Sequence, residues 1–211
     1  MSLAEPMTVA TDYALAALGV FLGLRLLRAG SGWPSRLVAL SFLVLAATAL
    51  VGGSLHGLAP GLSVAAKALL WRVVYGGVGL GNLFLLAGVL LVVLPTRWRA
   101  SAMAVLALRF LVATALALGR DFSFVLRDIA LTLLLLLGIA LFFTLVRRQA
   151  FGPFLLFGVV VSLLGAFVQA LQIAPHPSFN HNDLFHVLQM GGLYLCYRAA
   201  RAFPGQAAKG A

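Results

Sequence analysis

The sequence predicts an all-α membrane protein, a bundle of seven transmembrane helices with its N-terminus outside and its C-terminus in the cytoplasm. Three observations lead to this prediction. Of the 211 residues, 63% are hydrophobic and 9% are charged, whereas soluble domains carry roughly a quarter charged residues. Seven apolar segments reach the roughly 20 residues that cross a bilayer. Lys and Arg concentrate in alternate connections, as they do on the cytoplasmic side of membrane proteins.

Short breaks rich in glycine and proline, such as Ala59-Pro60-Gly61, separate the apolar segments. The polar stretches leave no room for a soluble domain, so we expect one transmembrane domain over residues 1–211. The third segment could begin as early as Ser63. The expected helices cover about 11–27, 37–58, 68–94, 100–118, 129–146, 151–173 and 183–203.

The distribution of charge sets the orientation. The first segment follows a start that contains Glu5 and Asp12 but no Lys or Arg, which is the wrong charge for a signal peptide, so we expect it to be retained as a helix. All five acids fall on the side that is poor in Lys and Arg, which we therefore place outside. The net charge of +10 lies in short connections rather than along a binding stripe, so it does not indicate a nucleic-acid partner. We expect a bacterial cytoplasmic (inner) membrane protein with its site on the outer side. The acids are Glu5, Asp12, Asp121, Asp128 and Asp183.

The stretch NHNDLFHVLQMGGLYLCYR, residues 180–198, places three ionisable side chains at the start of the seventh segment. Such groups are costly at membrane depth and so indicate a functional site, and imidazole and carboxylate are common zinc ligands. His181 and His186 are five residues apart, about 140° around a helix, so they converge only if His181 lies at or before the first turn. Asn180 or Asn182 as N-cap would allow this. Asp183, at i and i+3 to His186, would then orient that imidazole.

A second histidine is expected at the same depth. His56 lies about one turn from the outer end of the second segment, as His186 does from the start of the seventh. All four histidines fall on the outer side near one level, which indicates a site. One histidine at a helix end is more often a hydrogen-bonded interfacial residue than a ligand. His176, between two prolines, is more typical of a loop residue.

Other polar residues have simpler interpretations. Arg109, in the middle of the fourth segment, needs an internal partner or a wet cavity. Gly77 and Gly81 form a small-xxx-small pair that favours close helix packing. The single Cys196 excludes an intrachain disulfide and a cysteine metal cage. Four charged residues around the start of the fifth segment are expected to form interfacial salt bridges that end a helix: Arg120, Asp121, Arg127 and Asp128.

The run NDLFHVLQMGGLYL resembles the last helix of the hemolysin III and progestin/adipoQ receptor family, which reads HEIFH, and a similar His-x-x-x-His helix closes the alkaline ceramidases. Both belong to the CREST superfamily of seven-helix membrane proteins. The family's Ser-x-x-x-His motif of the second helix is matched by GGSLH at Gly52 and His56. The sequence departs from the pattern at three places. The first histidine of the seventh helix falls on Asn182, the serine falls on Gly52 with Ser54 two places later, and the third-helix acid has no counterpart.

The resemblance implies a zinc-dependent hydrolase of an amide or ester bond in a membrane lipid. Zinc held by His56, His181 and His186 would activate water. Asp183 would orient a ligand or shuttle the proton, and Tyr75 or Ser54 would stabilise the oxyanion. The residues expected to bind the lipid are Arg72, which could also contact the oxyanion, Gln169, Gln172 and Gln189.

Two other functions stay open. One is a non-catalytic protein that binds a lipid or small molecule, which the missing serine and acid favour. The other is a haem protein with His56 and His186 as axial ligands. A retinal pigment is disfavoured because the seventh segment has no lysine, and a transporter because no paired broken helices are visible.

Overall fold

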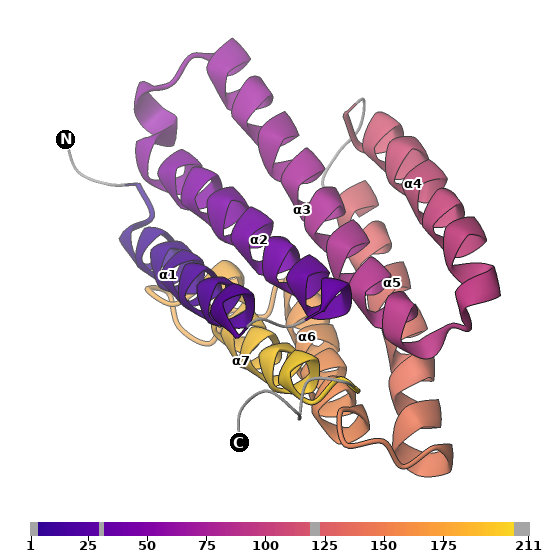
Figure 1. The fold of residues 1–211 in the computed structure, drawn as a ribbon. Coiled ribbons are helices and arrows are strands. Elements are labelled where there is room, and N and C mark those ends of the chain that lie inside the picture. The colour runs from indigo at the N-terminus through magenta and orange to yellow at the C-terminus, as the bar shows by residue number, and fades with distance from the viewer. Residues whose placement is uncertain (1–3, 30–31, 119–122, 205–211) are drawn as a thin grey trace.

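The computed structural model describes residues 4–29, 32–118 and 123–204, and these form an all-helical bundle without a β-sheet (Figure 1). A short 3-10 turn, Ala59–Gly61, follows α2, and a π-helical turn, Phe142–Val146, extends α5. Two residues named above, Arg120 and Asp121, lie outside the described ranges. Within those ranges the seven helices are α1 (Pro6–Arg28), α2 (Trp33–Leu58), α3 (Val64–Val93), α4 (Thr96–Leu118), α5 (Ser123–Leu141), α6 (Gly152–Leu171) and α7 (His181–Arg201).

Each of the seven predicted segments is a helix, and the helix starts follow local chemistry. Prolines occupy the first turn of α1, α2 and α6, where the missing N–H costs nothing. Ser63 caps α3, since its side chain accepts a hydrogen bond from the Ala66 N–H at 3.2 Å. The third helix therefore begins at the earlier of the two positions that the sequence allowed.

Six of the described helices are long and apolar enough to cross a membrane, namely α1 to α6 with their short extensions. The described α7 does not meet the same criterion of composition. Its first two turns carry His181, Asn182, Asp183 and His186, which lower its hydropathy. On the outside of the bundle, α4 exposes a row of apolar side chains, as expected for contact with lipid rather than water: Val105, Leu108, Leu111 and Val112.

Packing of the helices places the first and last helices of the chain side by side. α1 packs against both α2 and α7, α3 against α2, α4 and α5, and α6 against α5 and α7, so that α4 lies at the edge of the bundle in Figure 1. The predicted close approach at Gly77 and Gly81 is confirmed, because a Cβ at Gly81 would lie 2.7 Å from the Leu45 side chain of α2. The contact between α1 and α7 builds the candidate site.

Arg109 was expected to need an internal partner, and in the structure this partner is Asp128. The Arg109 guanidinium forms an ion pair with the Asp128 carboxylate and donates a hydrogen bond to Thr132 Oγ1 at 2.6 Å. Asn82 of α3 donates to Asp128 Oδ2 at 3.1 Å. The prediction that Arg109 needs an internal partner is confirmed, whereas the prediction that Asp128 belongs to an interfacial bridge at a helix end is wrong. Asp128 lies inside α5, where its carboxylate binds α3 and α4 together.

Candidate functional site

The start of α7 is built by a capping box. The Asn180 side chain accepts hydrogen bonds from the N–H groups of Asn182 at 2.8 Å and Asp183 at 3.3 Å. In return, Asp183 Oδ2 accepts the Asn180 N–H at 2.8 Å. This reciprocal pair satisfies backbone donors that the helix itself leaves unpaired. The N-cap is therefore Asn180, one of the two predicted candidates, and His181 is the first residue of the helix.

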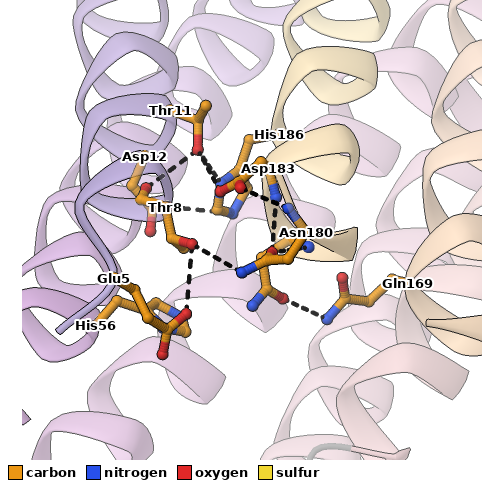
Figure 2. A network of polar contacts seen from close by, with 10 residues as sticks. Glu5, Thr8, Thr11, Asp12, His56, Gln169, Asn180, Asp183 and His186 are labelled. Carbon is orange, nitrogen blue, oxygen red and sulfur yellow. Dashed lines mark hydrogen bonds and ion pairs between the residues drawn. The ribbon is translucent and has the colours of Figure 1, made fainter. Parts of the chain in front are cut away.

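His186 lies one turn further along α7, where two residues of α1 hold its ring. Its Nε2 is 3.3 Å from Asp12 Oδ1, and its Nδ1 is 3.0 Å from Thr11 Oγ1 (Figure 2). Asp12 and His186 are 4% and 8% exposed, so this contact is shielded from solvent. With the ring hydrogen on Nε2, that nitrogen donates to Asp12 while Nδ1 accepts from Thr11, and both ring nitrogens are paired.

Asp183 does not contact the His186 ring, and its Oδ1 competes with His186 Nδ1 for the one hydroxyl proton of Thr11. Asp183 Oδ1 lies 3.5 Å from Thr11 Oγ1, and its other oxygen is engaged in the capping box. The carboxylate that contacts the His186 ring belongs to Asp12. The expectation that Asp183 orients the ring by an i, i+3 contact is thus replaced by a contact across two helices, because the capping box draws the Asp183 carboxylate back toward Asn180.

His56 of α2 has a different environment. Its Nδ1 lies 3.3 Å from Glu5 Oε2, and its ring meets the Trp71 ring edge-to-face with centroids 5.8 Å apart. Glu5 also accepts a hydrogen bond from Thr8 Oγ1 at 3.3 Å. Figure 2 shows His56 beside Glu5, with the His186 cluster further along α1. Both histidines line one cavity, so the predicted convergence of α2 and α7 is present.

The cavity has a volume of about 340 Å³ and lies among α1, α2, α3, α5, α6 and α7. Its wall holds one carboxylate, Asp12, and neither Lys nor Arg among the described residues. Four other polar residues of the wall come from α6 and α7: Gln169 donates to Asn182 Oδ1 at 2.9 Å, and Gln189 donates to the Ser162 carbonyl at 3.3 Å. The wall of the deeper part is largely apolar and includes Phe42, Leu45, Ala46, Leu85, Leu133 and Leu193.

Not all predicted residues reach the cavity. Tyr75, predicted to stabilise an oxyanion, lines it, as do Gln169 and Gln189, which were predicted to bind a lipid. Arg72 is exposed on α3, and Gln172 is exposed at the left-handed C-cap of α6 with φ 53°. Neither contributes to the wall of the cavity among the described residues. A ligand inside the bundle would therefore not meet these two side chains.

The three other predicted site residues that are absent from the cavity wall are Ser54, His181 and Asp183. Ser54 Oγ is 3.0 Å from the Tyr13 hydroxyl and donates to the Leu50 carbonyl at 2.8 Å. His181 is half-buried in the first turn of α7. His176 is an exposed loop residue whose Nδ1 accepts the Ser178 N–H at 3.0 Å, which agrees with its interpretation as a loop residue.

The described residues do not form a group of three or more His, Cys, Asp or Glu side chains arranged to hold a metal ion. His186 Nε2 is directed at Asp12, His56 Nδ1 at Glu5, and His181 is not part of the cavity wall. The zinc set predicted from the sequence is therefore not assembled in this geometry, and zinc stays a prediction.

Asp12 and Thr11 were missed as site residues. Asp12 was counted only as one of the acids of the outer side. It is nevertheless followed directly by the apolar run YALAALGV, which belongs to the first predicted transmembrane segment. An acid within a membrane-spanning segment is itself a signal of function. Thr8, Thr11 and Asp12 also repeat at helical spacing, which predicts one polar face on α1.

Fold and cavity together define this chain as an all-helical protein of membrane type with a largely apolar cavity inside the bundle. It belongs to DUF6962, a family of unknown function that matches it over residues 7–204. No curated protein and no solved structure matches the chain. The resemblance to the CREST superfamily accordingly depends on its two sequence motifs alone.

Proposed function

We propose that this protein binds an amphipathic, lipid-like molecule inside its transmembrane bundle. The main observation in support of this proposal is the uneven distribution of polar side chains along the cavity. Asp12, His56, His186 and Gln169 lie toward one end, and leucine and phenylalanine side chains line the deeper part. Ligand sites are typically apolar with a few converging polar groups that orient the ligand.

The length of the cavity also suits such a molecule. Trp71 and Leu85 both line it from α3, and they are about 21 Å apart at 1.5 Å per residue. The hydrocarbon core of a bilayer is about 30 Å thick. A ligand lying along α3 would therefore keep its tail at the depth of lipid tails and its head group near His56 and Asp12.

The proposal includes a complete membrane topology. We place seven helices across a bacterial cytoplasmic membrane, with α7 as the seventh span, the N-terminus outside and the polar end of the cavity on the outer side. Burial on α7 supports this placement, because Asp183 and His186 are 1% and 8% exposed and are covered by the bundle. Arg25 and Arg28 at the end of α1, with Arg198 and Arg201 at the end of α7, support a cytoplasmic location for those ends.

A pair of matched substitutions on α3 tests ligand binding. Val78 lines the cavity, whereas Val73 is 50% exposed on the outside of the same helix. Phenylalanine at position 78 would occupy part of the cavity, so Val78→Phe should weaken binding of tritiated dodecanol to the detergent-purified chain several-fold, and Val73→Phe should not. Scintillation proximity with an excess of unlabelled dodecanol measures the specific signal. Equal binding by both variants, or no saturable binding by the unsubstituted chain, would refute the proposal.

Zinc-dependent hydrolysis of a lipid amide or ester is a second proposal. One observation favours it, namely that His56, His186 and Asp12 line the same cavity. No catalytic step is derived, because the described side chains do not form a three-ligand group. Protein purified without a His tag should then contain about one zinc per chain, lost in His186→Ala and kept in His176→Ala. A metal-free protein would remove this second proposal and leave ligand binding untouched.

A further inference from the structure

One oxygen of Asp12 has no hydrogen-bond partner. Asp12 is 4% exposed, and its Oδ1 contacts His186. Its Oδ2 is buried and accepts no hydrogen bond from the described residues. Buried carboxylate oxygens are normally paired, because leaving one unpaired costs its full desolvation. An unpaired carboxylate oxygen in the wall of a cavity therefore indicates the place of a ligand donor.

Gly52 of α2 faces this buried oxygen without a side chain. Both Gly52 and Asp12 line the cavity, and a Cβ built on Gly52 would lie 3.7 Å from Asp12 Oδ2. Glycine thus places no side chain over the carboxylate from the facing helix α2. A ligand group approaching from the cavity meets Asp12 at this point.

The chemistry of the unpaired atoms specifies the ligand. Gln169 Oε1 is also buried without a partner, so the two fully buried unpaired side-chain atoms of the described cavity wall are both acceptors. Among the described residues, the wall contains one carboxylate and neither Lys nor Arg. A carboxylate or phosphate head group would lack a counter-charge there and would approach Asp12 at a cost, whereas a primary ammonium brings a positive charge and three donors.

We propose that the ligand of the cavity is an amphiphile with a primary ammonium head group, which donates a hydrogen bond to Asp12 Oδ2. His186 and Thr11 hold the carboxylate in place through Oδ1 and the imidazole ring. The alkyl chain extends past Leu45 toward Leu85 and Leu133. This inference rests on the proposed binding function and adds the class of head group to it.

Competition among four amphiphiles with the same chain length tests the head group. Tritiated dodecanol bound to the purified full-length chain at pH 7 is displaced by unlabelled dodecylamine, dodecanol, dodecyltrimethylammonium or dodecanoate. Dodecylamine should displace it at about tenfold lower concentration than dodecanol, the effect of about one charge-assisted hydrogen bond. Dodecyltrimethylammonium has the charge but no N–H donor and should be weaker than dodecylamine. Equal potency of dodecylamine with any of the other three, or stronger binding of dodecanoate, would overturn the assigned head group while the binding function stands.

Asp12→Asn tests the assigned residue. This substitution keeps the shape of the side chain and removes its charge, so the ratio of the dodecylamine affinity to the dodecanol affinity should fall to about one. Glu5→Gln is the charge-matched control, because it also removes one carboxylate near the start of α1. The Glu5 side chain is 42% exposed. Loss of the amine preference to the same extent in Glu5→Gln would show a general charge effect and overturn the inference, as would an intact preference in Asp12→Asn.

Gly52→Ser provides a second route that does not remove the buried carboxylate. The added Cβ fits at 3.7 Å from Asp12 Oδ2, and its hydroxyl can donate to that oxygen in place of the ligand. The amine preference should therefore fall about tenfold, whereas Gly76→Ser should keep it, since a Cβ at Gly76 meets nothing within 4 Å. An unchanged preference in Gly52→Ser would overturn the assignment. Absence of saturable binding for every amphiphile tested would remove the binding function itself.

Discussion

His186 Nε2 lies 3.3 Å from Asp12 Oδ1, which joins the last helix of the bundle to the first. Both side chains are almost fully buried, and Thr11 contacts the other nitrogen of the same ring at 3.0 Å. This contact joins the N-terminal halves of α1 and α7 at the polar end of the cavity. It makes α1 part of the candidate site, although α1 carries none of the site residues expected from the sequence motifs.

Removal of the Thr11 hydroxyl should destabilise the contact between α1 and α7. Thr11→Val preserves the volume of the side chain but leaves His186 Nδ1 without its partner, which should cost about 1–3 kcal/mol. Thr11→Ser retains the hydroxyl and should stay close to the unsubstituted chain. Thermal unfolding in detergent, monitored by circular dichroism, measures the difference. An unaltered transition in Thr11→Val would show that the hydrogen bond to His186 contributes little to stability.

Arg109 and Asp128 should behave as a coupled pair. Arg109→Met leaves the partly buried Asp128 carboxylate without its counter-charge, and the expected loss is at most that of a fully buried pair, about 3–5 kcal/mol. The double variant with Asp128→Leu should recover much of this loss, because neither charge then remains unpaired. Arg127, which is exposed on the same helix as Asp128, is the control, and Arg127→Met should change stability by less than about 1 kcal/mol.

Denaturant-dependent unfolding of the single and double variants measures the coupling energy between Arg109 and Asp128. Additive losses in the double variant would contradict the pairing. Asn82→Leu offers an independent measurement, since Asn82 donates to Asp128 Oδ2 and its loss should destabilise the same cluster by about 1 kcal/mol.

The capping box should stabilise the start of α7. Asn180→Ala removes the side-chain acceptor for two backbone N–H groups, with an expected cost of about 1 kcal/mol. Asn180→Asp keeps an acceptor at the N-cap and should preserve most of the stability. Hydrogen exchange of the amides of Asn182 and Asp183 reports the effect locally. Equal protection in the alanine and aspartate variants would mean that the cap does not hold this turn.

The proposed topology has a simple consequence for labelled variants. Cysteine introduced at Ser63, the N-cap of α3, should react with a membrane-impermeant maleimide added to intact cells. Cysteine at Thr96, the first residue of α4, should react only after the cells are opened. The native Cys196 is buried and serves as the background. The reverse pattern of labelling would invert the orientation assigned from the distribution of Lys and Arg.

Local sequence was sufficient to predict the helices. Runs of about 20 apolar residues produce helices in a bilayer because the backbone must satisfy its hydrogen bonds internally, and proline and asparagine mark several of the starts. The same reasoning predicted a capping asparagine before α7 and an internal partner for Arg109, because an unpaired charge at that depth is too costly. These features depend on residues close in the chain or on the depth of one side chain.

The identity of the partners was decided by the packing of the helices. Asp12 rather than Asp183 contacts His186, Asp128 pairs with Arg109 inside the bundle, and Ser54 is directed to Tyr13. Each outcome depends on the rotation of a helix about its axis and on its neighbours. The apolar composition of these helices leaves that rotation almost unspecified, since nearly every face is hydrophobic. The sequence therefore determined that polar groups gather at one end of a helical bundle, and the tertiary contacts determined which of them meet and which carboxylate oxygen remains without a partner.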